Sequence, residues 1–231
     1  MRRAWAVVPA AGSGRRMGAV VAKQDLPLCG QPLLAHALAP LLECRHITAV
    51  VLVVAPGDQR WQTLFRPGER LLTAYGGAER CHSVLNGLQR LAALALVDDW
   101  VLVHDAARPC LSGEELEALF DALGDDPVGG LLAVPLSDTL KAADEHHRVR
   151  QTMPREGLWR ALTPQMFRYG LLRDALQQAL DAGIVVTDEA AAMELAGHRP
   201  ALVAGRAGNI KVTSPEDLVL AEAVLRQRGD A

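Results

Sequence analysis

Near its start the chain runs from a short apolar segment, residues 5–8, straight into a glycine-rich loop that carries positive charge. The loop reads Pro-Ala-Ala-Gly-Ser-Gly-Arg-Arg-Met-Gly over residues 9–18, and Lys23 follows it. Glycine lets backbone N–H groups approach an anion closely, and the arginines and the lysine balance negative charge. A buried strand that opens into such a loop predicts an α/β protein that binds a polyphosphate at the end of the strand.

The loop matches neither of the two commonest phosphate-binding loops. A Walker loop requires Lys-Ser or Lys-Thr directly after its glycines, and neither pair follows here. A dinucleotide-binding loop requires Gly-x-Gly-x-x-Gly, but Gly12, Gly14 and Gly18 are spaced one residue too widely for it. Arg15 and Arg16 also stand where the dinucleotide loop packs small residues. The loop therefore indicates a nucleotide site of a different kind.

Short apolar segments alternate with helical ones along the chain. The candidate strands are residues 5–8, 48–55, 71–74, 100–104, 131–134, 201–204 and 210–212. The candidate helices are residues 33–44, 80–96, 113–123, 166–182, 188–196 and 215–228. Continuous apolar strands separated by helices predict an α/β fold with a Rossmann-like, mostly parallel, twisted sheet and helices on both faces.

A polar stretch over residues 136–158 interrupts this alternation. It is rich in charged side chains and is flanked by short segments that favour strands, which predicts a protruding β-hairpin arm. Because such an arm cannot bury a core of its own, we expect it to pack on a second subunit of a homodimer. A solvent-exposed loop is the alternative that composition leaves open. With this insertion, the chain is expected to form one domain over residues 1–231.

Composition disfavours several classes of protein. Aromatic residues make up 4% of the chain and the net charge is -3, which argues against a general nucleic-acid-binding protein. Every apolar run is shorter than the roughly 18 residues of a membrane span. The four cysteines lack Cys-x-x-Cys spacing and suit free thiols in a reducing compartment. We therefore expect a cytoplasmic protein with no nucleic-acid or membrane partner.

Asp105 follows directly on the candidate strand over residues 100–104. Ligands of open parallel sheets bind beyond the carboxyl ends of the strands, so this carboxylate is expected to face the glycine-rich loop. Carboxylates together with substrate phosphates are the usual ligands of Mg²⁺, which makes Asp105 a candidate metal ligand. An ion pair with Arg108 in the same loop is the alternative. His104, at the end of the strand, is expected to be a packed residue rather than a ligand.

Other segments also favour a nucleotide or an anion. Gly76 and Gly77 precede a helix that contains Ser83, and this junction either reads a base edge or caps the helix. Lys211 lies in an apolar segment and needs an anion, either a phosphate or a surface carboxylate. Thr187 opens a helix, and helix N-termini attract phosphate. On the arm, the side chains that either contact an anionic substrate or remain solvated are Thr139, Lys141 and Arg155.

Taken together, these segments resemble one family, the 2-C-methyl-D-erythritol 4-phosphate cytidylyltransferases of the non-mevalonate isoprenoid pathway. Six matching blocks occur in the family's order and extend over nearly the whole chain, so chance is a poor explanation for them. The blocks are residues 9–17 with Lys23-Gln24, Gly76-Gly77 with Arg80 and Ser83-Val84, residues 103–109, residues 163–165, residues 187–189, and residues 209–213 with 215–218.

The resemblance implies a fold like that of the nucleotide-diphospho-sugar transferases, with an arm that clasps a second subunit. It also implies the reaction of CTP with methylerythritol phosphate, which gives the cytidine-diphosphate alcohol and pyrophosphate with Mg²⁺ as the metal. The acceptor is a phosphate monoester with a second pKa of about 6, so its oxygen is largely ionised at neutral pH and needs no general base. Positioning, Mg²⁺ and cations at the α-phosphorus are then expected to dominate catalysis.

By the same resemblance, the candidate site residues fall into three groups. The catalytic cations at the transferring phosphate are Arg16, Lys23 and Lys211. The nucleotide-binding residues are Ala10, Ala11, Gly12, Ser13 and Gly14 in the loop, Gly77 and Ser83 at the cytosine, and Asp105 at the metal. The residues that bind the acceptor, in part across the dimer, are Arg108, Thr139, Arg155 and Thr187.

Three residues depart from the family pattern. Asp25 stands where an aromatic residue is usual, which is expected to loosen the packing near Lys23. Gly208 stands where relatives often carry an acid, which brings a second metal carboxylate into question. Ala78 replaces a frequent acid beside the glycine pair, where a main-chain contact survives the change.

Three other functions compete with this one. A sister cytidylyltransferase that acts on ribitol 5-phosphate shares most of the nucleotide blocks, and the residues around Thr139, Arg155 and Thr187 discriminate between the two. A nicotinamide-dependent oxidoreductase is disfavoured by the glycine spacing and by the lack of an acid at the end of the second strand. A non-catalytic binding paralogue is disfavoured because mere binding does not require a catalytic lysine, a metal carboxylate and a second lysine together.

Overall fold

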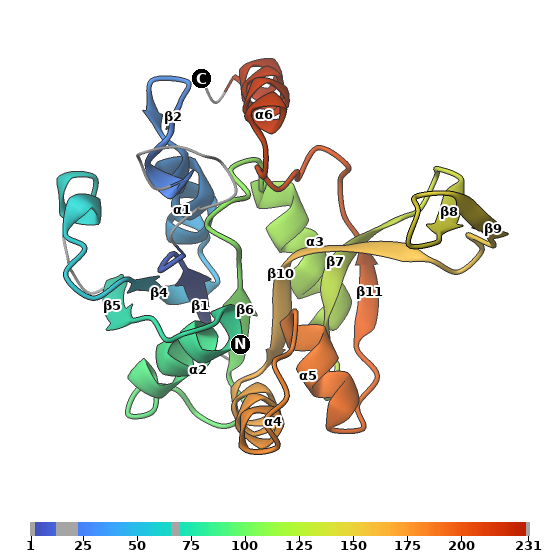
Figure 1. The fold of residues 1–231 in the computed structure, drawn as a ribbon. Coiled ribbons are helices and arrows are strands. Elements are labelled where there is room, and N and C mark those ends of the chain that lie inside the picture. Colours follow the sequence, from blue (N-terminus) through green and yellow to red (C-terminus); the bar gives the residue numbers. More distant parts are fainter. Residues whose placement is uncertain (1–2, 13–22, 66–69, 230–231) are drawn as a thin grey trace.

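The computed structural model describes residues 3–12, 23–65 and 70–229, with the backbone alone at Lys23. Within these ranges, seven strands form one sheet in the order β11-β7-β10-β6-β1-β4-β5 (Figure 1). Neighbouring strands are parallel except where β10 pairs with β6 and with β7. The strands are β1 (Ala4–Pro9), β4 (Ile47–Val54), β5 (Leu71–Tyr75), β6 (Trp100–Val103), β7 (Gly129–Pro135), β10 (Trp159–Arg168) and β11 (Ala201–Ala204).

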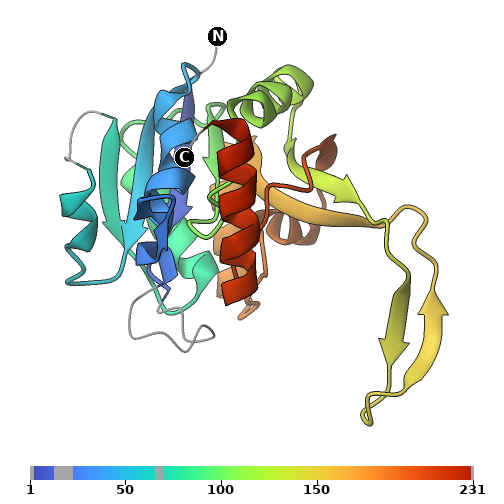
Figure 2. The ribbon, with the colours of Figure 1, turned by 90° about the horizontal axis from the view of Figure 1, so that it is seen from above.

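Helices cover both faces of the sheet, as Figures 1 and 2 show from two directions. One face packs against α1 (Leu33–Glu43) and α3 (Gly113–Leu123). The other face packs against α2 (Arg80–Arg90), α4 (Tyr169–Asp181) and α5 (Glu189–Leu195). Apart from a hairpin within residues 136–158, the remaining described elements are α6 (Pro215–Arg228), the small β2–β3 hairpin (Pro27–Leu28 and Gln31–Pro32), and the 3-10 turns η2 (Lys23–Asp25) and η3 (Arg60–Thr63). Among the described helices, none is both long enough and apolar enough to cross a membrane.

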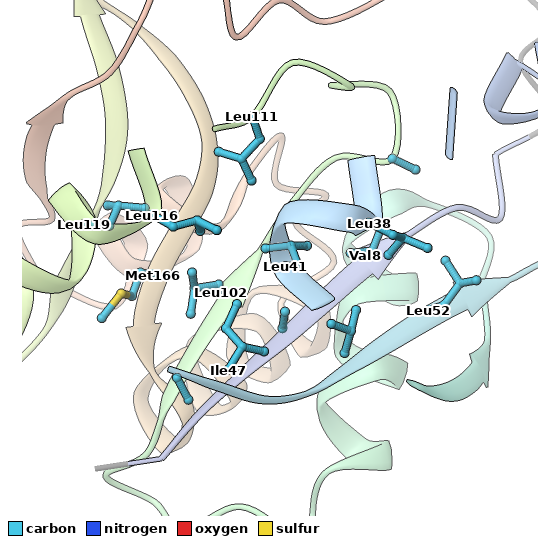
Figure 3. Close-up of a cluster of buried hydrophobic side chains, with 14 of the residues drawn as sticks. Val8, Leu38, Leu41, Ile47, Leu52, Leu102, Leu111, Leu116, Leu119 and Met166 are labelled. Carbon is cyan, nitrogen blue, oxygen red and sulfur yellow. The ribbon is translucent and has the colours of Figure 1, made fainter. Parts of the chain in front are cut away.

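The strands send alternate side chains to the two faces, and both faces are apolar. In β1, Ala6 and Val8 join the cluster beneath α1 and α3, whereas Trp5 and Val7 join the cluster on the opposite face. A strand that is buried on both sides must read as a continuous apolar run, and this is why the parallel strands are visible in the sequence. Figure 3 shows the first cluster, with Val8, Leu38, Leu41, Ile47, Leu52, Leu102, Leu111, Leu116, Leu119 and Met166 labelled.

This architecture confirms the predicted fold class, a mostly parallel sheet with helices on both faces. The helices over residues 113–123 and 215–228 begin and end where the sequence predicts. At the first of them, the backbone N–H of Glu115 donates to Oγ of Ser112 at 3.3 Å, while the Ser112 N–H donates to the Glu115 carboxylate at 3.2 Å. These reciprocal bonds form a capping box that fixes the start of α3.

Strand β10 is the element that the sequence does not reveal. Its middle contains Thr163, Pro164 and Gln165, and proline in particular argues against a central strand. The structure accommodates Pro164 where the pairing register with β7 shifts, between Ala161 and Gln165. Residues 166–168, which we expected to begin a helix, complete this strand, and α4 follows. The predicted strand over residues 210–212 is absent from the described part of the chain, where these residues form a loop.

Residues 136–158 contain a separate two-stranded antiparallel sheet, β8 (Leu140–Ala143) and β9 (Val149–Met153). This arm extends from the ends of β7 and β10 and stands away from the body (Figure 2). Leu140 pairs with Met153 at the end of the hairpin nearer the body, and every residue of β9 is exposed. The arm is therefore ordered by its own backbone pairing and buries little of its own surface.

Candidate functional site

Four parallel strands, β1, β4, β5 and β6, end at the same edge of the sheet, and the loops that follow them meet there. The backbone N–H of Ala10 donates to the carbonyl oxygen of Val53 at 2.7 Å. The N–H of Gly76 donates to the carbonyl oxygen of Val54 at 2.8 Å. The loop after β1 and the loop after β5 are therefore both held against the end of β4, at the edge where open α/β sheets bind ligands.

Ala11 and Gly76 show how closely these two loops approach each other. A Cβ atom built on Gly76 would lie 2.3 Å from the Cβ of Ala11 and 3.0 Å from Oγ of Ser83. This contact leaves no room for a side chain at position 76, so the close approach of the backbones requires glycine. Gly12 is exposed, and the space where its Cβ would stand is open. Residues 10–12 thus lie beside the second glycine pair.

Ser83 ties the second loop to the start of α2. Its hydroxyl oxygen accepts a hydrogen bond from the N–H of Gly77 at 3.1 Å, and the hydroxyl donates to the carbonyl oxygen of Glu79 at 3.2 Å. The side chain is buried, and the N-cap position of the helix belongs to Glu79 rather than to the serine. Ser83 therefore fixes the shape of the loop, while Gly77 is exposed beside it.

Asp105 lies directly after β6, is 7% exposed and is surrounded by cations. Nε of Arg80 donates to its Oδ1 at 2.9 Å. Nζ of Lys211 lies 2.7 Å from its Oδ2, and Nε of Arg108 lies 3.8 Å from the same oxygen. Lys211 was expected to need an anion, and within the chain that anion is Asp105. The carboxylate draws together residues from three separate motif blocks.

The charges around Asp105 determine its protonation state. Burial alone would raise its pKa, but the positive charges of Arg80 and Lys211, with a further contribution from Arg108, outweigh burial and hold the pKa well below its usual value. Asp105 is therefore ionised at neutral pH. Burial lowers the pKa of Arg108, but a guanidinium stays protonated at such a site.

Arg80 and Glu189 form a second buried ion pair, which the sequence did not assign to the site. Nη1 of Arg80 lies 2.6 Å from Oε1 of Glu189, and Nη2 donates to Oε2 at 3.2 Å. Glu189 begins α5 and is 1% exposed; burial raises its pKa, and Arg80 partly offsets that effect. The two residues are 109 positions apart, so no local pattern connects them. The available signal was that each lies within one of the motif blocks.

His104 and Thr163 hold the backbone of Asp105 in place through a chain of hydrogen bonds. Nε2 of His104 donates to the carbonyl oxygen of Arg108 at 3.0 Å, because a carbonyl only accepts, and the hydroxyl of Thr163 donates to Nδ1 at 2.9 Å. The Thr163 oxygen in turn accepts from the N–H of Asp105 at 3.1 Å. Burial lowers the pKa of His104 to about 4, so the ring is neutral. The prediction that His104 is a packed residue is confirmed.

Asn209 holds the segment that carries Lys211. The side chain is fully buried, and its amide donates to the carbonyl oxygen of Thr163 at 2.9 Å. Nη1 of Arg108 donates to the carbonyl oxygen of Asn209 at 2.7 Å, and Nη2 donates to that of Ala161 at 3.4 Å. Arg108 therefore joins the loop after β6 to the loop before α6, and its guanidinium donates hydrogen bonds to backbone carbonyl groups of the chain itself.

Comparison with known proteins agrees with this geometry. A model of the family described as 2-C-methyl-D-erythritol 4-phosphate cytidylyltransferase matches residues 4–227. The chain belongs to this family. A member from Dechloromonas aromatica is 54% identical over 99% of this chain and 100% of its own length. A second member, from an Azoarcus species, is 52% identical over 98% of this chain and 95% of its own length.

Solved structures of the family share the fold. One, described as 4-diphosphocytidyl-2C-methyl-D-erythritol synthase, aligns with a TM-score of 0.84 at 37% identity, over 97% of this chain and 99% of that one. The family member from Francisella tularensis aligns with a TM-score of 0.84 at 31% identity, over 96% of this chain and 100% of that one. The antiparallel β10, the arm and the cation cluster thus occur on a chain whose whole length aligns with the family.

Several residues assigned from the family resemblance fall outside these contacts. Ser13, Gly14 and Arg16 lie outside the described residues, as does the side chain of Lys23. The neighbouring Gln24 donates from Nε2 to the carbonyl oxygen of Ala10 at 3.0 Å, which holds η2 beside the start of the glycine-rich loop. The catalytic and nucleotide-binding roles of Ser13, Gly14, Arg16 and Lys23 stay predictions.

Three of the four residues expected at the acceptor are exposed and lie in two places. Thr187 precedes α5, close in sequence to Glu189. Thr139 and Arg155 flank the β8–β9 hairpin at its end nearer the body, where Nη1 of Arg155 donates to the carbonyl oxygen of Ser137. The fourth, Arg108, is instead buried against Asp105, as described above. The hairpin that Thr139 and Arg155 flank stands away from the body (Figure 2).

Two departures from the family pattern have visible surroundings. Asp25 was expected to loosen the packing near the nucleotide loop, but its Oδ2 lies 2.6 Å from Nη1 of Arg60, which also pairs with Asp58. The ion pair thus links η2 to η3, although burial raises the pKa of Asp25 more than Arg60 lowers it. A Cβ on Gly208 would lie 3.6 Å from the side chain of Val224, so the side chain of an acid at this position would contact α6 at its first atom.

Asp105 fits Mg²⁺ only as a single protein ligand. Among the described residues, no group of three or more His, Cys, Asp and Glu side chains is arranged to hold a metal. An ionised carboxylate is the hard oxygen donor that Mg²⁺ prefers, and this ion usually completes its shell with water and substrate phosphates. The donor set therefore suits a metal that arrives with a nucleotide rather than a resident ion.

Proposed function

We propose that this chain transfers CMP from CTP to 2-C-methyl-D-erythritol 4-phosphate, giving 4-diphosphocytidyl-2-C-methyl-D-erythritol and pyrophosphate. The observation that carries the proposal is the ionised Asp105, clamped between Arg80 and Lys211 at the sheet edge where the two glycine loops meet. Membership of the cytidylyltransferase family supplies the nucleotide and the acceptor.

The chemistry requires position and positive charge more than proton transfer. An oxygen of the acceptor phosphate attacks the α-phosphorus of CTP, and the bond from that phosphorus to the bridging oxygen of pyrophosphate breaks. The attacking monoester is largely ionised at neutral pH, since its second pKa is about 6. The structure agrees with a reaction that needs no base, because both ring nitrogens of the nearby His104 are occupied by internal hydrogen bonds.

On the nucleotide side, residues 10–14 bind the phosphates, and Gly77 with Ser83 forms the place for cytosine. Arg16, Lys23 and Lys211 stabilise the charge that develops at the α-phosphorus. Asp105 is the protein ligand for Mg²⁺, which supplies a Lewis acid to the triphosphate oxygens when it is bound. The position of Lys211 supports these assignments. Its side chain contacts Asp105 and is 43% exposed, so it lies at the rim of the site.

On the acceptor side, Thr187 binds the substrate phosphate together with Thr139 and Arg155 of a second subunit, and Arg108 acts through its buried contacts at Asp105. The arm supports this arrangement, because the hairpin that Thr139 and Arg155 flank stands away from the body (Figure 2) and nearly all of it is exposed. A two-stranded hairpin is marginally stable alone, so the arm gains from packing on a neighbour. We therefore propose a homodimer in which each arm completes the other subunit's site.

The proposal places the enzyme in the cytoplasm. All four cysteines lie in the described ranges and are free thiols, as expected in a reducing compartment. The proposed substrates are charged phosphates, which bind here to side chains at the open edge of the sheet. Fractionation of the source cells, with activity measured in the soluble and the membrane fractions, tests this location.

Pyrophosphate release tests the function directly. The assay contains CTP and Mg²⁺ with either methylerythritol phosphate or ribitol 5-phosphate, and each acceptor is omitted in turn as a control. Release with methylerythritol phosphate alone is the expected result. Release with ribitol 5-phosphate alone would preserve the nucleotide site and overturn the acceptor. Binding of CTP without release from either acceptor would indicate a non-catalytic paralogue.

A further inference from the structure

Arg80 stands where three elements of the site meet. It is the first residue of α2, the helix that also carries Ser83. Its guanidinium contacts the carboxylate of Asp105 after β6 and the carboxylate of Glu189 at the start of α5. The side chain is 27% exposed, so most of it is enclosed between these two acids. One planar group thus contacts the nucleotide side and the acceptor side of the site.

The contact with Asp105 makes the two oxygens of that carboxylate unequal. Oδ1 accepts from Nε of Arg80 and lies 2.9 Å from Nη2 of the same guanidinium, while Nη1 and Nη2 also contact Glu189. Oδ2 has Nζ of Lys211 as its nearest partner, at 2.7 Å on a side chain that is 43% exposed, and lies 3.8 Å from Nε of the buried Arg108. A ligand that approaches Asp105 therefore meets one fixed oxygen and one oxygen whose partner can move.

The contact with Glu189 fixes the start of α5. This carboxylate is 1% exposed, and a buried carboxylate without a partner is costly, so its position follows that of Arg80. On the opposite side, Nε2 of Gln165 donates to Oδ2 of Asp188 at 2.9 Å, and its Oε1 accepts from the N–H of Ala190 at 2.8 Å. The segment that includes Thr187 is thus anchored at both sides of its helix start.

We propose that Arg80 is a positioning residue that joins the two halves of the site: it holds Oδ1 of Asp105, so that Oδ2 alone exchanges with a ligand, and through Glu189 it holds the Thr187 segment. The inference rests on the proposed function, because it takes that segment to bind the acceptor phosphate and Asp105 to bind the nucleotide's metal. Substitution of an outer partner of this type lowers metal affinity or activity by about 10–100-fold.

Two variants separate the two contacts of Arg80. Glu189→Gln keeps the shape of the side chain but removes its charge, and Arg80→Lys keeps a positive charge but cannot contact both acids with a planar fork. The matched controls are Glu194→Gln on the exposed side of α5 and Arg90→Lys at the exposed end of α2. For each variant we would measure the KM of both substrates, CTP binding by calorimetry with and without Mg²⁺, and the thermal unfolding midpoint.

Glu189→Gln is expected to raise the KM for the acceptor by about 10-fold or more while CTP binding stays within about twofold of the parent. Arg80→Lys is expected to raise the acceptor KM and also to weaken the CTP binding that depends on Mg²⁺. In the double variant, the acceptor KM is expected to equal that of Arg80→Lys, because both changes break the same link. The controls are expected to match the parent protein.

Other outcomes overturn the inference. If the unfolding midpoint falls while both KM values and CTP binding are unchanged, the cluster is only structural. If the two substitutions multiply their effects on the acceptor KM, Arg80 and Glu189 act independently. Should Glu189→Gln fail to fold, Arg80→Lys still decides, since an unchanged Mg²⁺-dependent CTP affinity contradicts the role at Oδ1. Inactivity of the parent protein toward methylerythritol phosphate would instead refute the proposed function, and Mg²⁺-dependent CTP binding would still test the contact with Asp105.

Discussion

The cluster at Asp105 and the arm are built in opposite ways. At Asp105, side chains from positions as distant as 80, 108 and 211 surround one buried carboxylate. In the arm, the contacts are local: Lys141 donates to Thr152 at 2.7 Å, and the N–H groups of His146 and Arg148 both donate to Asp144 at 2.9 Å. The first region is organised by its own chain, whereas the second presents nearly all of its surface.

This difference shows where each half of the proposed site gets its precision. The nucleotide half has its charges placed before any ligand arrives, which is how electrostatic stabilisation works without reorganisation. The arm exposes apolar side chains, with Val149 65% and Met153 38% exposed, which suits contact with another surface. We therefore propose that the arm gains its working geometry on assembly of the dimer.

The largest expected effect comes from Lys211 on the organised side. Lys211→Ala removes the cation that we propose to act on the transferring phosphate, and we expect kcat to fall by about 10²–10³-fold, as for other donors to developing charge. The fold should survive, since the side chain is partly exposed. The control is Arg226→Ala on α6, an exposed cation paired with Glu222. Near-normal kcat in Lys211→Ala, measured by pyrophosphate release, would remove this lysine from catalysis.

The next effect tests whether the arm serves a neighbouring subunit. Asp105→Asn damages the body of one chain, and Arg155→Ala damages the arm of another, so each variant alone is expected to lose most of its activity. When the two chains are refolded together in equal amounts, half of the dimers are mixed, and one of the two sites in each mixed dimer is intact. The mixture should therefore recover about a quarter of the parent activity. No recovery, with mixed dimers verified by differential tags, would show that the arm acts within its own chain.

A third prediction concerns the buried His104, whose pKa is about 4 in the folded chain. The unfolded chain binds this proton near pH 6.5 and the folded chain does not, so stability should fall as the pH drops from about 6.5 to about 4. The loss attributable to His104 is about 3 kcal/mol over this window. Asp105 contributes little there, because the stability that its lowered pKa provides is lost only as the pH falls below the ordinary aspartate pKa of 3.8.

Chemical denaturation at several pH values measures this effect. His104→Gln keeps a hydrogen-bonding side chain and removes the titration, so its unfolding free energy should vary less between about pH 6.5 and pH 4 than that of the parent. Parallel pH curves for the two proteins would mean that the histidine is not held neutral. The contrast between the preorganised cluster at Asp105 and the arm would then be weaker.

The smallest expected effect is at the surface of the organised region. Asp25→Asn weakens the pair with Arg60, whose side chain is 53% exposed and keeps its second partner Asp58. Exposed pairs contribute little, so we expect the unfolding free energy to change by less than about 1 kcal/mol and kcat to stay within about twofold. A larger loss of kcat would show that the η2–η3 link positions the nucleotide loop.

The parallel part of the fold could be predicted because its strands are largely apolar runs, and α3 and α6 begin with capping boxes that are visible in the sequence. β10 could not, since Pro164 and its polar neighbours break the apolar pattern, and the register shift that accommodates them is a tertiary feature. Residues 210–212 look like a strand because Ile210 and Val212 are apolar, yet they pack in the cluster beneath α6. Burial there comes from a helix rather than from a sheet.

The candidate site was predictable where single motifs carry it and not where distant residues combine. Asp105 and Lys211 stood out because an acid after a strand and a lysine in an apolar segment both need a partner. That they are partners of each other, and that Arg80 joins Asp105 to Glu189, depends on the topology that brings β6, α2 and α5 to one edge. The spacing of these residues along the chain does not show that they are in contact.

The arm has a consequence for how this chain tolerates change. Pro135 at the end of β7 pairs with Trp159 at the start of β10, and the N–H of Leu136 donates to the carbonyl oxygen of Leu158 at 3.0 Å. The two connecting segments therefore leave the sheet side by side, and the arm is a long hairpin loop closed at its root. Its tip can accept an inserted peptide or a dye pair without disturbing the register of the sheet. Dyes at the turn over residues 144–148 would measure the distance between the arms of the proposed dimer in solution.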